Sequence, residues 1–97
     1  SSMFSGTSSF NQPLNSWDVS SVIDMEGMFV SSSQFNQPLN NWNVSSVGVM
    51  DYMFNNASAF NQDLSMWCVS NIPTMPTGFD IGASSWTLPR PVWGTCP

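Results

Sequence analysis

The side chains that could do chemistry in this chain are two cysteines, six carboxylates and one arginine, with no His and no Lys. Cys68 and Cys96 both lie in the last third. An even cysteine count favours a disulfide, and two free buried thiols are the alternative. Closing this loop would stabilise the fold by roughly 3–4 kcal/mol. Two Cys without His cannot complete a zinc shell, so we expect no metal site.

The serines and carboxylates offer little for catalysis. No serine has a His base, and neither His nor Lys is present to carry protons at neutral pH. Asp24 and Glu26 are two apart on an expected helix, so they do not face each other. Asp18 would lie near Asp51 or Asp63, and we interpret these carboxylates as solvated surface charges. No stretch of the sequence has the spacing of Ca²⁺ ligands. We therefore expect no enzyme and no cofactor.

The composition excludes further classes of function. Charged residues make up 7% of the 97 residues, and the net charge is −5. Nucleic-acid binding and attraction to an anionic membrane both need Lys and Arg, of which there is one in total. No run approaches the ~20 apolar residues of a spanning helix, and we find no signal peptide. The surface must instead be built from eighteen Ser and ten Asn. It is expected to be neutral and rich in hydrogen-bonding groups.

The side chains named above lie in a sequence repeat of 25 residues, and the fold of this repeat must position them. The phrase Phe-Asn-Gln-Pro-Leu-Asn-x-Trp starts at Phe10, returns at Phe35 and returns more loosely at Phe60, where Asp63 replaces the proline. A fixed period of this size is typical of a solenoid, whose units bury their apolar faces on their neighbours. We therefore expect a single repeat domain over 1–97. Its parts are a partial repeat (1–9), two repeats (10–34 and 35–59), a divergent repeat (60–84) and a C-terminal cap (85–97). Because the chain opens in mid-repeat, we expect it to be a processed or cut piece.

The apolar spacing changes within a unit. Trp17 and Val19 are two apart, which is the period of a strand. Met25, Met28 and Phe29 follow at helical spacing. Each unit is thus expected to contain a short strand, a turn, about two turns of helix and a Ser/Asn-rich return.

Stacking such units places identical residues above one another. Asn11, Asn36 and Asn61 form one such column. We hypothesise that it is a buried asparagine ladder bonded to the backbone of the turns, and simple solvent exposure is the alternative. Trp17 and Trp42 recur at a core period, which favours packing over a sugar-stacking platform. The Met pairs are likewise expected in the core rather than at a soft-metal site.

The end of the chain departs from the repeat. Trp86 and Trp93 keep the seven-residue spacing of Phe60 and Trp67, which predicts a degenerate capping half-unit. Both cysteines would then share an outward face. In strict register they would be offset by two residues, about 8 Å, slightly beyond bridging range. A one-residue insertion before Trp86 could absorb that offset.

These motifs resemble a known family. Leu-x-x-Trp-x-Val-x-x-Val-x-x-Met-x-x-Met-Phe, at 14–29 and 39–54, resembles a leucine-rich repeat with Trp, Val and Met in apolar slots. The whole phrase is similar to the short repeat of bacterial surface proteins and lipoproteins related to the BspA-like surface proteins. The resemblance implies an α/β fold: a right-handed leucine-rich-repeat-like solenoid with one short parallel strand and one short helix per repeat. It also implies secretion, surface display, and adhesion or protein recognition.

The outward positions of the expected strands are the candidate binding face. They are Asp18, Ser20, Asn43, Ser45 and Ser70. We expect a non-enzymatic extracellular or cell-surface module that binds a protein or glycan on another surface. One alternative is a structural subunit of a fibre or surface layer that assembles through the open solenoid end, with further copies of itself as partners. A minor alternative is ice binding, suggested by a repetitive and nearly uncharged face.

Two glycosylation sequons fit an exported protein. They are Asn43-Val44-Ser45 and Asn56-Ala57-Ser58. Such tripeptides also arise by chance in a chain this rich in Asn and Ser.

Overall fold

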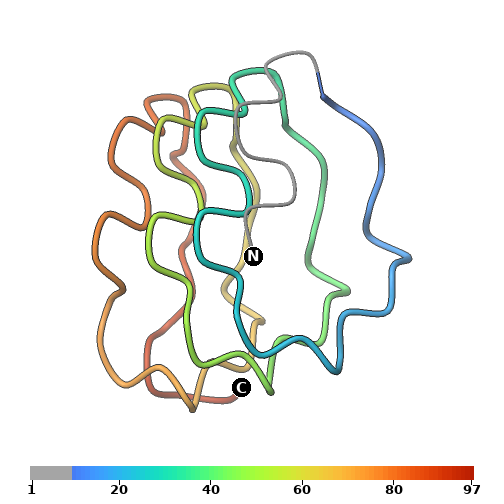
Figure 1. The fold of residues 1–97 in the computed structure, drawn as a ribbon, viewed down its shortest axis with the longest axis vertical. Coiled ribbons are helices and arrows are strands. Elements are labelled where there is room, and N and C mark those ends of the chain that lie inside the picture. The colour runs from blue at the N-terminus through green and yellow to red at the C-terminus, as the bar shows by residue number, and fades with distance from the viewer. Residues whose placement is uncertain (1–9) are drawn as a thin grey trace.

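The computed structural model describes residues 10–97, which wind into a stack of coils lying side by side (Figure 1). We name the first coil 10–34, the second coil 35–59, the third coil 60–84 and the half coil 85–97. Equivalent residues of successive coils are referred to below as a column. The expected partial repeat at 1–9 lies outside the described residues.

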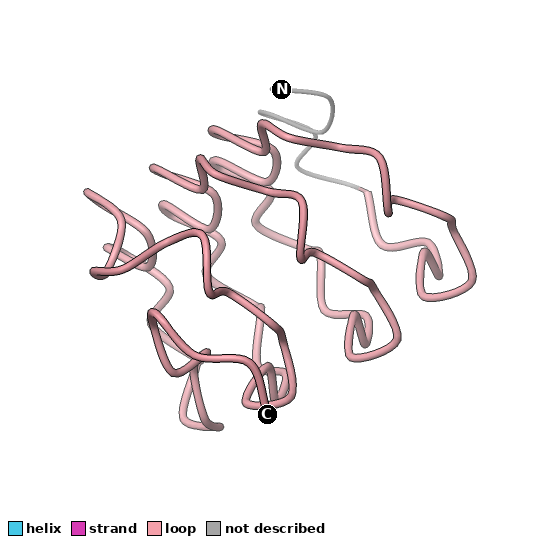
Figure 2. Cartoon of the chain, turned by 90° about the horizontal axis from the view of Figure 1, so that it is seen from below, coloured by secondary structure: helices cyan, strands magenta, loops and turns pink. Residues whose placement is uncertain are grey.

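The coils contain neither helices nor strands. Among the described residues the backbone forms turns and bends, with one isolated parallel bridge between Asp24 and Val49 (Figure 2). The prediction of an α/β solenoid with one strand and one helix per repeat is therefore wrong. The 25-residue spacing nevertheless corresponds to one circuit of the chain, because the backbone bonds between coils join residues about that far apart.

Two tight turns leave no room for the expected strand. The Trp17 amide donates to the carbonyl of Leu14 at 2.9 Å, and the Val22 amide donates to the carbonyl of Val19 at 3.0 Å. The same two turns recur in the second and third coils. A strand must offer its amides to a neighbouring strand. Here the amides that flank the strand position are already used within the coil.

Left-handed residues break the expected helix. Gly27 and Ser31 have φ of 62° and 60°, and Tyr52 and Asn56 both have φ of 59°. A right-handed helix cannot pass through such residues. The chain instead makes successive turns, such as that from Met28 N to Met25 O at 3.2 Å. These turns bring apolar residues inward at spacings of three, three and one, which is the spacing that also predicts a helix.

Alternate amides in this segment join one coil to the next. Gly27 N donates to Asp51 O and Phe29 N donates to Met53 O, both at 2.9 Å. The second coil donates to the third in the same way, as from Phe54 N to Phe79 O at 2.9 Å. The segment therefore satisfies its backbone groups both within its own coil and across to its neighbour.

Phenylalanine rings stack through the centre of the coils. Phe35 lies parallel to Phe10 and Phe60, with ring centroids 5.7 and 5.9 Å apart. Phe29 and Phe54 form a second column, 5.4 Å apart. Leucine, valine, methionine and tryptophan side chains complete the core around these rings. Offset-stacked aromatic pairs add to the free energy gained by burial.

Trp17 does not follow the expected core pattern. Its side chain is 47% exposed, whereas Trp42 and Trp67 are 4% and 1% exposed. Trp17 lies in the first coil, and no coil among the described residues packs on its N-terminal side. The tryptophan column is thus buried only where it lies inside the stack.

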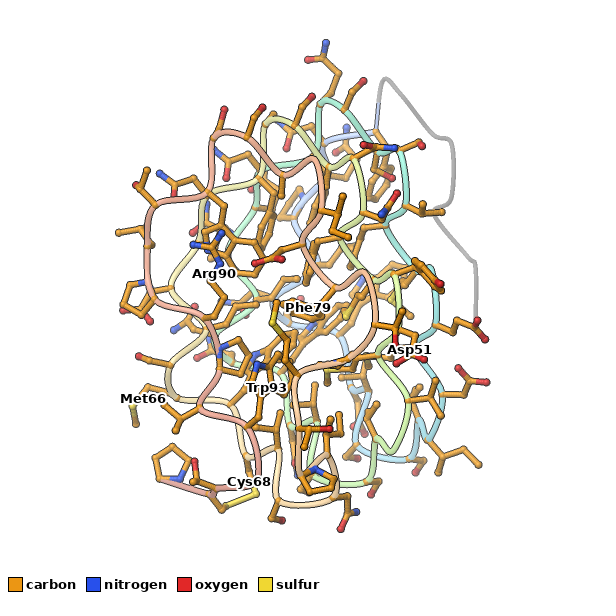
Figure 3. All side chains as sticks on the ribbon, turned by 90° about the vertical axis from the view of Figure 1, so that its left-hand side faces the viewer. Asp51, Met66, Cys68, Phe79, Arg90 and Trp93 are labelled. Carbon is orange, nitrogen blue, oxygen red and sulfur yellow. A yellow bond between two sulfur atoms is a disulfide. The ribbon has the colours of Figure 1, made fainter. Side chains whose placement is uncertain are left out.

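A different set of contacts closes the C-terminal end, which Figure 3 views from outside. Trp86 meets Phe60 edge-on at 4.9 Å, and Trp93 meets Phe79 edge-on at 4.9 Å. Arg90, the one basic residue of the chain, lies 4.4 Å above the Trp86 ring. Its Nε is 3.0 Å from Asp80 Oδ2. The half coil 85–97 therefore covers the last Phe rings, as the predicted cap would.

Candidate functional site

The predicted binding face consists of Asx turns in the first two coils. Asp18 Oδ1 accepts hydrogen bonds from the Ser20 amide at 3.0 Å and the Ser20 hydroxyl at 2.6 Å. Asn43 Oδ1 accepts the same pair from Ser45, at 3.1 and 2.7 Å. Asp18 and Asn43 are exposed, so this column presents preformed turns to solvent.

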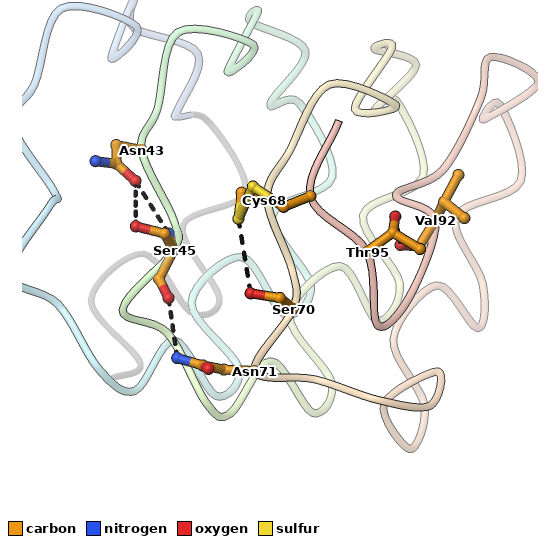
Figure 4. Close-up of a disulfide and its surroundings, with 8 residues drawn as sticks. Asn43, Ser45, Cys68, Ser70, Asn71, Val92 and Thr95 are labelled. Atoms are coloured by element: carbon orange, nitrogen blue, oxygen red, sulfur yellow. Dashed lines mark hydrogen bonds between the residues drawn. A yellow bond between two sulfur atoms is a disulfide. The ribbon is translucent and has the colours of Figure 1, made fainter.

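The third coil modifies this column. Cys68 replaces the Asx residue, and its Sγ lies 3.8 Å from the hydroxyl of Ser70. Asn71 Nδ2 donates to the carbonyl of Ser45 in the second coil at 3.0 Å (Figure 4). The five predicted face residues therefore lie on three neighbouring coils, and the bond from Asn71 to Ser45 O joins the turn of the third coil to that of the second.

The two aspartates in such turns are held in their charged form. Hydrogen bonds from the Ser20 hydroxyl and then the Ser20 amide lower the pKa of Asp18 below its ordinary value of 3.8. The pKa of Asp63 is lowered in the same way by the hydroxyl and then the amide of Ser65. A hydrogen bond donated to a carboxylate favours ionisation. Both turns thus carry a negative charge at neutral pH.

The predicted asparagine column forms a ladder, but at the surface. Asn11 Oδ1 accepts from the Asn36 amide at 2.9 Å, and Asn36 Oδ1 accepts from the Asn61 amide at 2.8 Å. Gln37 Nε2 and Gln62 Nε2 add bonds to the same two oxygens, at 3.1 and 2.9 Å. Asn11 and Asn36 are exposed, so the prediction that the column is buried is wrong. Each asparagine bonds to the backbone of the next coil rather than to a turn of its own.

Two further ladders were missed from the sequence. Trp42 Nε1 donates to Leu14 O at 2.7 Å, and Trp67 Nε1 donates to Leu39 O at 2.9 Å. The recurrence of Trp at a core position was visible in the sequence, and a buried indole N–H needs an acceptor. A short amide ladder also runs from Asn15 Oδ1, which accepts from the Asn41 amide at 2.9 Å.

A disulfide joins Cys68 to Cys96 and ties the half coil to the third coil (Figure 4). The two Cα atoms are 4.0 Å apart. The spacing between coils lengthens to 26 residues here, since the Val69 amide donates to Thr95 O at 2.9 Å. The cysteines are 28 residues apart, so the register alone would leave the expected offset of two residues. The turn in which the Thr95 amide donates to Val92 O removes this offset and brings the two cysteines together.

Residues 10–97 enclose no pocket, and no three of the Asp, Glu and Cys side chains in this range converge as metal ligands would. The same range contains no helix long and apolar enough to cross a bilayer.

The geometry defines a repeat protein, with columns of identical residues that join each coil to the next. A family model described as "Mycoplasma protein of unknown function, DUF285" matches residues 1–87, and the chain belongs to this family. No curated protein and no solved structure matches the chain. The family description names no activity.

Proposed function

We propose that this chain is a non-enzymatic extracellular module for adhesion or protein recognition. The observation that carries the proposal is the exposed column of Asx turns at Asp18 and Asn43. Each turn uses Oδ1 and leaves the second polar atom of an exposed side chain outside those bonds, a carboxylate oxygen at Asp18 and an amide nitrogen at Asn43. The chain has no His and no Lys, which supports a binding role over catalysis.

Rigid turns suit recognition by many weak contacts. The Asx side chains are already bonded to their own serines, so little rotamer entropy remains to be lost on binding. The outer atoms of these turns stay exposed to accept or donate hydrogen bonds to a protein or glycan partner. A single small face gives modest affinity, and repetition along an array would raise it through effective concentration.

The Cys68–Cys96 disulfide supports a location outside the cytosol. Structural disulfides persist in oxidising compartments and are rare where thiols are kept reduced. We therefore propose a location at a cell surface or in the extracellular space. The similarity of its repeat phrase to bacterial surface-protein repeats points the same way.

A binding screen with matched variants tests this function. The purified disulfide-bonded chain, tetramerised for avidity, is screened against a panel of glycans and cell-surface proteins. The Asp18→Ala, Asn43→Ala double variant should lose at least tenfold in affinity for any ligand found. Asp63→Ala is the matched control, because Asp63 is also exposed and bonded to a serine two residues on. Equal binding by both variants would exclude the turn column as the binding face.

A structural role is the second candidate, and exposed apolar side chains favour it. Ile81 and Val92 near the C-terminal end are 65% and 58% exposed. An apolar side chain that faces water loses exposed area when a second copy packs on it, which would favour association. Light scattering on a sizing column across a concentration series tests this candidate. A mass that rises with concentration would support assembly, and a constant monomer mass would exclude it.

A further inference from the structure

The sequon at Asn43 has its acceptor nitrogen outside the hydrogen bonds of its own turn. Oδ1 of Asn43 is occupied by the amide and hydroxyl of Ser45, at 3.1 and 2.7 Å. Nδ2 donates no hydrogen bond to the described residues and lies on the side of the amide away from Ser45 (Figure 4). The intervening Val44 is buried, which anchors the tripeptide, while Asn43 itself is exposed. The turn therefore holds the amide through Oδ1 and leaves Nδ2 of this exposed residue outside those bonds.

We propose that Asn43 is an acceptor for an N-linked glycan. Sequons of the Asn-x-Ser type are modified on surface segments of exported proteins. The donor would be an oligosaccharide carried on a lipid pyrophosphate. Nδ2 bonds to the anomeric carbon as the bond from that carbon to the pyrophosphate oxygen breaks. The lipid pyrophosphate leaves with the electron pair, and one Nδ2 proton passes to a base of the transferase.

The second sequon offers a built-in comparison within the same chain. Asn56 has φ of 59°, and its amide donates to Ile81 O at 2.7 Å. Its Oδ1 lies against Gly82, so closely that a Cβ added there would overlap it. This side chain is packed against the third coil, whereas that of Asn43 is held by its own turn. We expect Asn43 to be modified in preference to Asn56.

A glycan at Asn43 would change the proposed binding face. Asn43 lies between the turns of Asp18 and Cys68 in the same column. An oligosaccharide there would cover the neighbouring turns or would itself become the surface that a partner meets. The inference rests on the proposed extracellular location, because the lipid-linked donor is met during export.

The proposal is tested by fusing a cleavable export signal to the N-terminus of the chain and translating the fusion in vitro in the presence of microsomes. Import is scored separately by protection from added protease, and a glycan is scored by an endoglycosidase-sensitive mass step. We expect one glycan on the imported chain. Asn43→Gln and Ser45→Ala should abolish it, whereas Ser45→Thr and Asn56→Gln should retain it. Site mapping by mass spectrometry should find Asn43 occupied at least fivefold more than Asn56.

The outcomes separate this proposal from the proposed function. If the imported, disulfide-bonded chain carries no glycan at Asn43, the glycan proposal is wrong, whereas the proposed binding function is unaffected. Equal use of both sequons would overturn the selection of Asn43 by its turn. A chain that the signal cannot carry into the microsomes would overturn the extracellular location on which both proposals rest.

Discussion

The first two coils and the C-terminal end both bury apolar side chains against a neighbouring coil, but they do so with different contacts. In the coils, like residues stack on like, as Phe35 does between Phe10 and Phe60. At the end, Trp86 turns edge-on to Phe60 and a disulfide clamps the half coil. A column of stacked rings continues only while the next coil supplies an equivalent ring. Where the repeat stops, other groups must complete each column.

The asparagine column shows how such a completion works. Within the stack, Asn36 Oδ1 accepts one backbone amide, that of Asn61. At the end, Asn61 Oδ1 accepts two, from Thr87 at 2.9 Å and Leu88 at 3.0 Å. The half coil has no asparagine at this position, yet its backbone still closes the ladder. The sequence of the last coil can therefore diverge while the hydrogen bonds to its neighbour persist.

Removing the disulfide should break the C-terminal end most strongly. The Cys68→Ser, Cys96→Ser variant should lose about 3–4 kcal/mol of unfolding free energy, because the unfolded chain gains the freedom of an open loop. Urea denaturation measures this loss, and reductant on the unmodified chain should reproduce it. Hydrogen exchange should rise more in 85–97 than in 35–59. An equal rise in both segments would contradict the view that the disulfide acts as a local clamp.

Two glycine substitutions test the backbone of the third coil against that of the second. Gly78 has φ of 63°, and a Cβ there would overlap the Tyr52 ring. Gly78→Ala should destabilise the protein by about 1–3 kcal/mol. Gly48 has no positive φ and nothing within 4 Å of an added Cβ. Gly48→Ala should therefore be neutral or stabilise by about 0.4–1 kcal/mol. A reversed order in thermal or urea unfolding would refute the assignment of left-handed positions.

Alanine substitutions of Asn36 and Asn61 compare the stability that the asparagine ladder adds inside the stack with the stability that it adds at the C-terminal end. Asn36→Ala should cost about 1 kcal/mol, the usual net value of a hydrogen bond that water can partly replace. Asn61→Ala should cost more, because two backbone amides at the cap lose their acceptor. Asn41→Ala is the control, since its side chain bonds to none of the described residues and its effect should be close to zero. Unfolding free energies from urea titration decide the order, and no loss for Asn36→Ala would mean that the ladder adds nothing to stability.

Acid should weaken the first coil slightly while leaving the matching turn of the second unchanged. The pKa of Asp18 is lowered in the fold, so its stabilising effect is present above the unfolded value and is lost as pH falls through the folded value. The same holds for Asp63. Stability should therefore decline below about pH 4. The Asp18→Asn, Asp63→Asn variant should decline less, as measured by melting temperature from pH 6 to 2. An identical decline would assign the acid sensitivity to other carboxylates.

The sequence predicted the repeat and its apolar positions but not its local structure. The 25-residue spacing and the inward Phe, Leu and Val positions follow from side-chain type alone. The helix prediction was wrong because Met25, Met28 and Phe29 have helical spacing although a left-handed Gly27 lies between them. Tyr52 occupies the equivalent place in the second coil, and nothing in a tyrosine indicates positive φ. Residue preference therefore agrees with positive φ at Gly27 but gives no sign of it at Tyr52.

The candidate site was predicted in part for the same reason. Asp18 and Ser20 are exposed or partly exposed turn residues, and the pairing of Asp with a serine two residues on is readable as an Asx turn. The asparagine ladder was expected from its period, but the choice between burial and exposure was not settled, because burial depends on which side of the coil faces solvent. The indole bond from Trp42 to Leu14 O joins residues 28 apart. Such a bond needs the register between coils, which the sequence gives only approximately.

The direction of the asparagine ladder has a consequence for how this molecule folds. Each Oδ1 accepts an amide of the following coil, so a coil alone cannot complete these bonds. The smallest ordered nucleus is therefore two adjacent coils, and growth from that nucleus adds one coil at a time at either edge. Loss of order should likewise proceed inward from the edges. The second coil, which has neighbours on both sides, should be the last to melt.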